Sequence, residues 1–187
     1  MQNEILSNNS NNNNAQNEDD GVIVITKLVV SIVICQMAGF VGAFFTMPAM
    51  KGWYENIEKP FFAPPDWIFA PVWVVLFLLM GVSLFLVWEK RADGEAKVIF
   101  ATQLILNILW SVFFFGLKSP GLAFIDLVLL WFSILCMIII FYKIHKLAGF
   151  LLIPYILWVT FAGFLNFVIW MANEGITLTE ILNYINW

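Results

Sequence analysis

The chain has little charge, little cysteine and one histidine, and each shortage argues against a class of protein. Only 12% of its 187 residues are charged, against about 25% in an ordinary soluble domain. Its nine basic residues are scattered between apolar blocks, so no basic face for nucleic acid is expected. Cys35 and Cys136 lie inside apolar runs and give no support for a disulfide scaffold. The lone His145 has no second ligand at a suitable spacing, so no metal site is predicted.

Long apolar runs are what the chain has in abundance. Residues of the set AVILMFWYC make up 61% of it, and 17% of it is aromatic. A bilayer core of about 30 Å requires roughly 20 apolar residues per spanning helix. Five stretches have that length: 22–45, 67–88, 98–117, 121–142 and 148–172. Because these runs do not alternate in polarity, a β-barrel is disfavoured, and the sequence predicts an all-α membrane protein, a five-transmembrane-helix bundle.

Three further segments complete the predicted organisation. Residues 1–21 are rich in Asn and low in complexity, which predicts a disordered tail. Their acidic start differs from that of a secretory signal, so the tail is expected to stay attached. The five helices would form one domain over 22–175, followed by a C-terminal tail, 176–187. Lys and Arg are slightly more frequent on the tail's side of the membrane, which places the tail inside.

The separator between the first two helices, 46–66, is unusually long. Loops of about twenty residues in a compact protein tend to be lids or binding segments. Four prolines restrict its backbone, and Trp53, Tyr54, Phe61 and Phe62 give it an aromatic surface. It is predicted to cover a site, although Trp and Tyr also collect at membrane interfaces for structural reasons.

Three predicted helices carry distinctive faces when they are projected at 100° per residue. The second carries a largely aromatic stripe, the third carries amides and a hydroxyl, and the fifth sets large rings beside a small residue. Membrane amides usually face the bundle interior. The stripes are Phe69, Trp73, Phe77, Met80 and Leu84; Gln103, Asn107, Ser111 and Phe114; and Tyr155, Trp158, Ala162 and Asn166. Each stripe alone is also typical of helix packing, but together they predict an apolar ligand pocket with a few orienting polar groups.

Conventional catalytic machinery is not evident in the sequence. There is no Ser, His and Asp constellation, no phosphate-cradling glycine loop and no carboxylate pair. Asp126, the one carboxylate well inside a predicted span, lies six residues after Pro120. It is expected to reach the interface or to stabilise the start of its helix, in preference to acting as a proton or ligand site.

The same residues resemble the TspO/MBR family, the tryptophan-rich sensory and translocator proteins also known as peripheral benzodiazepine receptors. The likeness spans about 39–173. Three ordered stretches carry it: WYENIEKPFFAPPDWIFAPVWVVLFLLMG, QLILNILWSVFFFG and LLIPYILWVTFAGFLNFVIWMAN. The resemblance implies a five-helix membrane bundle, often a homodimer, with a pocket beneath the first long loop. It also implies that the pocket binds porphyrins and other lipophilic molecules.

Carried over by motif, the resemblance assigns nine ligand-binding residues. They are Trp53, Tyr54, Trp73, Phe77, Asn107, Ser111, Phe114, Trp158 and Ala162. No tightly bound cofactor is expected, since the porphyrin would be a ligand or a substrate. The expected partners are porphyrins, other lipophilic small molecules, the lipid bilayer and a second copy of the chain. A multi-pass protein of this kind belongs in the cell membrane if it is bacterial, or in the mitochondrial outer membrane or another organelle membrane if it is eukaryotic.

Three functions remain open from the sequence. The first is binding of porphyrins (protoporphyrin IX and heme-type tetrapyrroles) in tetrapyrrole transport, sensing or stress regulation. The second is light- and oxygen-dependent porphyrin degradation, in which the resemblance makes Trp73 and Trp158 the catalytic candidates. The third is a membrane scaffold or regulator that acts through partners of its two tails.

Overall fold

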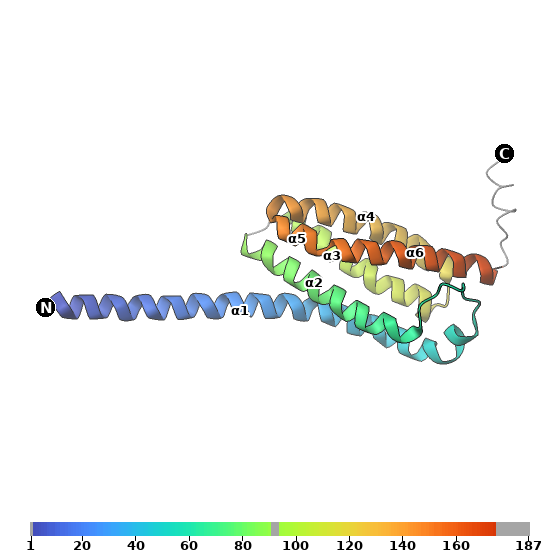
Figure 1. Cartoon of the computed structure of the whole chain (residues 1–187), viewed down its shortest axis with the longest axis horizontal. Coiled ribbons are helices and arrows are strands. Elements are labelled where there is room, and N and C mark those ends of the chain that lie inside the picture. The colour runs from blue at the N-terminus through green and yellow to red at the C-terminus, as the bar shows by residue number, and fades with distance from the viewer. Residues whose placement is uncertain (1, 91–93, 175–187) are drawn as a thin grey trace.

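A computed structural model describes residues 2–90 and 94–174, with side chains from residue 20 onward, and these residues form a bundle of long helices (Figure 1). Within that part of the chain, five helical segments are long and apolar enough to cross a membrane. The prediction of an all-α, five-transmembrane-helix bundle is confirmed. The elements in chain order are α1 (Gln2–Ala49), η1 (Met50–Tyr54), η2 (Asp66–Ile68), α2 (Phe69–Glu89), α3 (Gly94–Ser111), η3 (Val112–Gly116), α4 (Pro120–Ile144), α5 (Lys146–Leu151) and α6 (Ile153–Glu174).

The helices extend beyond the apolar runs that predict them. α2 ends at Glu89 and α3 already begins at Gly94, so Glu95 and Lys97 lie inside a helix and not in a separator. A helix that has formed adds each further residue at little cost, and its charged end turns can stand in the headgroup region. Charge therefore marks where the membrane ends more closely than where the helices end.

At the N-terminus the structure differs from the predicted disordered tail, because α1 runs through the Asn-rich segment to Gln2. In Figure 1 this part of α1 projects beyond the other helices. The spanning part of α1 supplies a helix nucleus, so the extension requires no new nucleation. The predicted C-terminal tail, 176–187, lies outside the described residues.

The predicted loop 46–66 also begins later than expected. α1 stays helical to Ala49 with Pro48 inside it, and η1 follows directly. Backbone groups in the hydrocarbon region must be paired within the chain, which favours continuing the helix until it leaves the membrane. The chain changes direction at Gly52, whose φ of 117° is a conformation that glycine adopts readily.

The fifth span consists of two helices, α5 and α6, that meet at Leu152. Pro154 lacks the N–H that would continue the hydrogen-bond ladder, and the amide of Leu152 instead donates to the Gly149 carbonyl at 3.2 Å. The break lies well inside the expected helix 148–172. It lets α5 pack on α2 while α6 follows α4.

The five spans form a ring. α1 packs on both α2 and α3, α4 packs on α3 and α6, and α2 closes the ring through α5. The backbone of α2 therefore lies close to α5 and not close to α6. Its contact with α5 is at the Glu89 end of α2 (Figure 1). The space between the Phe69 end of α2 and α6 has to be filled by side chains or left as a cavity.

A close helix contact fixes the tight end of this ring. A Cβ atom added at Gly81 of α2 would lie 2.7 Å from the Cα atom of Ile32 on α1. On the neighbouring side of α2, the buried Ser83 hydroxyl donates to the Ala148 carbonyl of α5 at 2.8 Å. Small residues of this kind let membrane helices approach closely without a hydrophobic driving force between them.

Replacing Gly81 with Val should separate α1 from α2. The obstructing atom belongs to backbone and cannot move aside, so we expect the free energy of unfolding to fall by about 1–3 kcal/mol. Thermal unfolding in lipid nanodiscs measures this, and Gly21→Val is the matched control because nothing lies within 4 Å of a Cβ atom there. Equal melting temperatures for the two variants would contradict the close contact.

Candidate functional site

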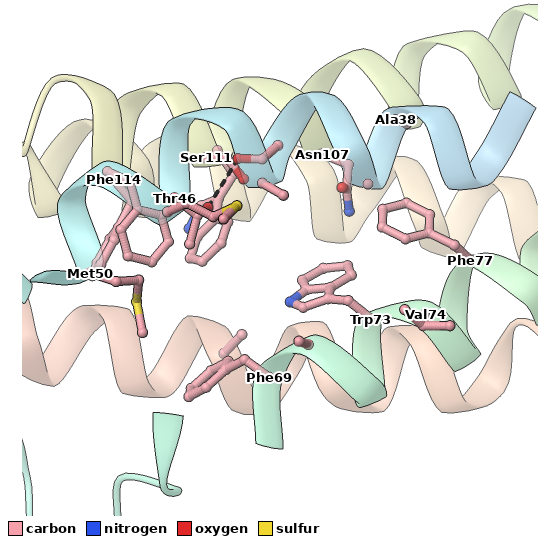
Figure 2. Close-up of a pocket in the computed structure, with 18 of the residues that line it drawn as sticks. Ala38, Thr46, Met50, Phe69, Trp73, Val74, Phe77, Asn107, Ser111 and Phe114 are labelled. Carbon is pink, nitrogen blue, oxygen red and sulfur yellow. Dashed lines mark hydrogen bonds between the residues drawn. The ribbon is translucent and has the colours of Figure 1, made fainter. Parts of the chain in front are cut away.

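A cavity of about 430 Å³ lies inside the ring, at the end where α2 and α6 are apart. Its walls come from α1, α2, α3 with η3, and α6, and Asp66 of η2 and Tyr54 of η1 lie at its loop end. Figure 2 shows Phe69, Trp73 and Phe77 of α2 facing Asn107, Ser111 and Phe114 across the open space. Its volume falls in the range of sites that bind small molecules, roughly 300–1,000 Å³.

Eight of the nine residues predicted to bind a ligand line this cavity. The structure brings together Tyr54, Trp73, Phe77, Asn107, Ser111, Phe114, Trp158 and Ala162. Trp53 is the exception, since its ring packs against Phe114 with centroids 5.5 Å apart and lies outside the cavity wall. The inward direction of the amide face on the third span is confirmed by the burial of Gln103, Asn107 and Ser111. Ligand binding itself stays a prediction.

Four aromatic rings that line the cavity form one continuous chain of contacts from α2 to α3 and η3. The ring of Phe77 lies 5.5 Å from that of Trp73, which lies 6.5 Å from Trp110, which lies 5.4 Å from Phe114. The planes of successive rings differ by 30°, 32° and 22°. We call these four residues the aromatic wall. Its rings come from α2, α3 and η3, and each ring plane lies within 32° of the next.

Buried hydrogen bonds support the wall from behind. Asn107 donates to the Tyr155 hydroxyl at 2.9 Å, and that hydroxyl donates to the side-chain oxygen of Gln103 at 3.1 Å. The Gln103 amide in turn contacts the sulfur of Met80 at 3.3 Å. Unpaired amides in a membrane interior are costly. The network therefore fixes α3 against α6 and α2 in one register.

A second pair of hydrogen bonds holds Trp110. Its indole N–H donates to Asn166 Oδ1 at 3.1 Å, and the Asn166 amide donates to the Pro120 carbonyl at 2.7 Å. Asn166 thus connects the aromatic wall to the first turn of α4. The ring of Trp110 is held in place by a polar contact that no single helix face reveals.

The loop covers the end of the cavity near Tyr54. The backbone N–H of Glu58 donates to Asn173 Oδ1 and the Asn173 amide donates back to the Glu58 carbonyl, both at 3.0 Å. The ring of Phe62 stacks on Phe164 at 5.3 Å. These contacts clasp the loop to α6, as a cover predicted from its prolines and aromatic residues would require.

A charged pair lies within this cover. The Lys59 ammonium lies 3.8 Å from Asp66 Oδ1 and 4.0 Å from the centre of the Tyr54 ring. Asp66 and Tyr54 both line the cavity. The ammonium therefore joins the loop to the cavity end through a cation–π contact as well as an ion pair.

Sequence reasoning missed one complete wall, which is contributed by α1. Its lining residues are mostly small, and they recur at helical spacing: Ala38, Gly39, Gly42, Ala43 and Thr46. A Cβ atom added at Gly42 would lie 3.0 Å from Ser111 Oγ, so the small stripe lets α1 approach α3. The spacing of these residues was a usable signal. Trp110 was also missed, because the prediction for this helix relied on the polar residues Asn107 and Ser111.

The position of Asp126 differs from the one expected, at the membrane interface or at the start of its helix. The residue is buried, and its Oδ2 atom has no hydrogen-bond partner among the described residues. The start of α4 instead places Ser119 at the cap position, without a side-chain hydrogen bond. Asp126 does not line the cavity, so it offers no group to a ligand there.

The side chains at the cavity are suited to binding more than to acid–base chemistry. The described residues contain no group of three or more His, Cys, Asp or Glu side chains able to hold a metal ion. Asp66 is the one carboxylate among the lining residues, and it is partnered by Lys59. An apolar, ring-lined space with a few amides and hydroxyls fits a lipophilic guest.

Comparison with known proteins agrees with this geometry. The model of the TspO/MBR family matches residues 31–171. The tryptophan-rich protein TspO of Archaeoglobus fulgidus is 43% identical over 151 residues, which cover 80% of this chain and 98% of that protein. The translocator protein of Bos taurus is 35% identical over 144 residues, covering 74% and 85%. The tryptophan-rich sensory protein of Cereibacter sphaeroides is 35% identical over 115 residues, covering 62% and 73%.

The family model covers the second, third and fourth membrane-crossing segments completely and most of the first and the fifth. It also contains every residue of the aromatic wall and of the hydrogen bonds that support it. The chain is a multi-pass integral membrane protein, and it belongs to the TspO/MBR family.

Proposed function

We propose that this protein binds porphyrins and other flat lipophilic molecules in the cavity and acts in tetrapyrrole transport, sensing or stress regulation. The aromatic wall is the observation that carries the proposal. Four contacting rings at the cavity supply aromatic surface, which favours an aromatic macrocycle over a saturated flexible chain. Aromatic contacts of this kind contribute about 0.5–1.5 kcal/mol each beyond the area they bury.

Polar groups at the cavity would orient the guest. Ser111 and Asn107 lie opposite α2 in Figure 2, and the Lys59 ammonium lies at the loop end. A porphyrin with carboxylates would place its apolar face on the wall and its carboxylates toward the loop, where the Lys59 ammonium lies. This arrangement supports reversible binding of the porphyrin as a ligand, not as a permanent cofactor.

Removing one ring of the wall should weaken porphyrin binding. Trp73→Ala takes away the ring that touches Phe77, Trp110 and Tyr155, so we expect the Kd for protoporphyrin IX to rise about tenfold or more. Quenching of Trp fluorescence in nanodiscs measures it. Trp88→Ala is the control, because Trp88 lies at the far end of α2 and does not line the cavity. Non-saturable quenching, or equal Kd values for both variants, would refute the proposal.

A second candidate is light-driven degradation of the porphyrin with oxygen as the oxidant. The observation that favours it is a chain of oxidisable rings leading from the cavity into the core. The ring of Trp73 lies 6.5 Å from Trp110 and 6.3 Å from the buried ring of Tyr155. Electron transfer along such rings needs no acid–base pair, and the described residues that line the cavity offer none.

Illumination separates the two functions. If the protein degrades its ligand, purified protein with protoporphyrin IX in air should yield a bilin-like product by absorption spectroscopy and mass spectrometry. Trp73→Phe and Trp158→Phe keep an aromatic ring but are harder to oxidise, so they should slow product formation about tenfold or more while binding persists. Bleaching at the wild-type rate in both variants would leave binding as the function.

A further inference from the structure

The side of the cavity formed by α1 and α2 differs from the other sides in exposure. Phe40 and Met47 of α1 line the cavity and are 70% and 73% exposed, and Val74 of α2 lines it and is 55% exposed. The lining residues from α3, η3 and α6 are buried or half-buried. Residues that line a cavity and also face outward form its rim, so the cavity opens between α1 and α2.

On the side away from the loop, close contacts between α1 and α2 end the opening. The Gln36 amide of α1 donates to the Val74 carbonyl of α2 at 3.0 Å. Next to it, a Cβ atom at Gly39 would lie 2.8 Å from the Phe77 ring. Together with the contact between Gly81 and Ile32, these interactions close α1 on α2 over the half of the bundle away from the loop. The opening is confined to the half that contains the cavity.

The loop end of the cavity is closed by contrast. Two hydrogen bonds join Glu58 to Asn173, Phe62 stacks on Phe164, and Lys59 bridges to Asp66. A ligand coming from water would have to break several of these contacts. A ligand coming from the side meets only the apolar side chains of the rim.

The depth of the opening places it beside lipid. Phe40 lies nine residues before the end of α1 at Ala49, or about 13 Å along the helix. Val74 lies five residues after the start of α2 at Phe69, or about 8 Å. Both positions lie within segments able to cross a hydrocarbon core of about 30 Å. The inner part of the opening, at Phe40 and Val74, is therefore at a depth suited to acyl chains, while Met47 and Ala70 lie within two residues of their helix ends.

We propose that the ligand reaches and leaves the cavity sideways, directly from the bilayer, through the opening framed by Phe40, Met47, Ala70 and Val74. This inference rests on the proposed function, since it describes the path of the same flat lipophilic guest. Such a molecule partitions into lipid at high concentration, and it can slide edge-on between α1 and α2 to reach the aromatic wall. The clasped loop then acts as a roof that keeps water out, and it need not open on each binding cycle.

Widening the rim should speed exchange in both directions. Phe40→Ala removes a ring from the opening, so we expect the association rate for protoporphyrin IX to rise about threefold or more, together with the dissociation rate. Stopped-flow quenching in nanodiscs measures both rates. Phe44→Ala is the matched control, since Phe44 is 75% exposed on the same helix but does not line the cavity. A wall contact without a role in the path would change the dissociation rate alone, and that result would overturn the inference.

Narrowing the rim should have the opposite effect. Ala70→Trp places a large ring at the opening, and we expect both rates to fall about tenfold, while Val75→Trp, on an exposed position outside the cavity, should leave them unchanged. Ala70→Trp can also lower the rates by filling the cavity, so Phe40→Ala gives an independent result of opposite sign. Rates that match wild type in both rim variants would exclude the lateral path.

Loosening the roof tests the competing aqueous path. Asn173→Ala removes both hydrogen bonds to Glu58 without touching the cavity, and lateral access predicts rates within about twofold of wild type. Faster exchange in this variant would show access past the loop and would overturn the inference. An opening filled by a resident lipid acyl chain would give association rates independent of porphyrin concentration, which would also overturn it. Absence of saturable quenching in wild type would instead defeat the proposed function.

Discussion

The cavity depends on how α2 is held, because close helix contacts fix it at one end, while at the other end its backbone is apart from α6 and only side chains such as Phe69 and Trp158 meet. Near Gly81 it is pressed against α1, and Ser83 ties it to α5. Toward Phe69 its backbone lies apart from α6. Helices in lipid have no general hydrophobic drive to close such a gap, so close contacts at one end can coexist with an open space at the other.

The polar groups of the bundle interior stabilise that asymmetry. Tyr155 receives a hydrogen bond from Asn107 and gives one to Gln103, and Asn166 holds the indole of Trp110. Each of these polar side chains has a hydrogen-bond partner inside a low-dielectric medium, where an unpaired amide would be costly. The aromatic wall is thus positioned by a polar framework, in which Asn166 holds the indole of Trp110 directly.

Much of this architecture can be predicted from the sequence. Five apolar runs specify five helices, because a bilayer of fixed thickness accepts only segments of that length with all backbone groups paired. The inward direction of the polar side chains was also predictable, since Gln103, Asn107 and Ser111 would be costly in contact with lipid. Eight of nine residues assigned to the pocket do line the cavity. Trp53 follows the kink at Gly52, and its ring packs on Phe114 and does not line the cavity.

The sequence by itself determined the class of protein, the number of spans and most of the inward faces, since these follow from the match between helix period and membrane thickness. Only the tertiary structure decided that α1 forms a wall, that Trp110 joins the aromatic wall, and that the cavity opens between α1 and α2. These features depend on how closely neighbouring helices approach, which Gly39, Gly42 and Gly81 permit but do not specify alone. Distances between helices arise from all their contacts together, and a single helix face contains only half of each contact.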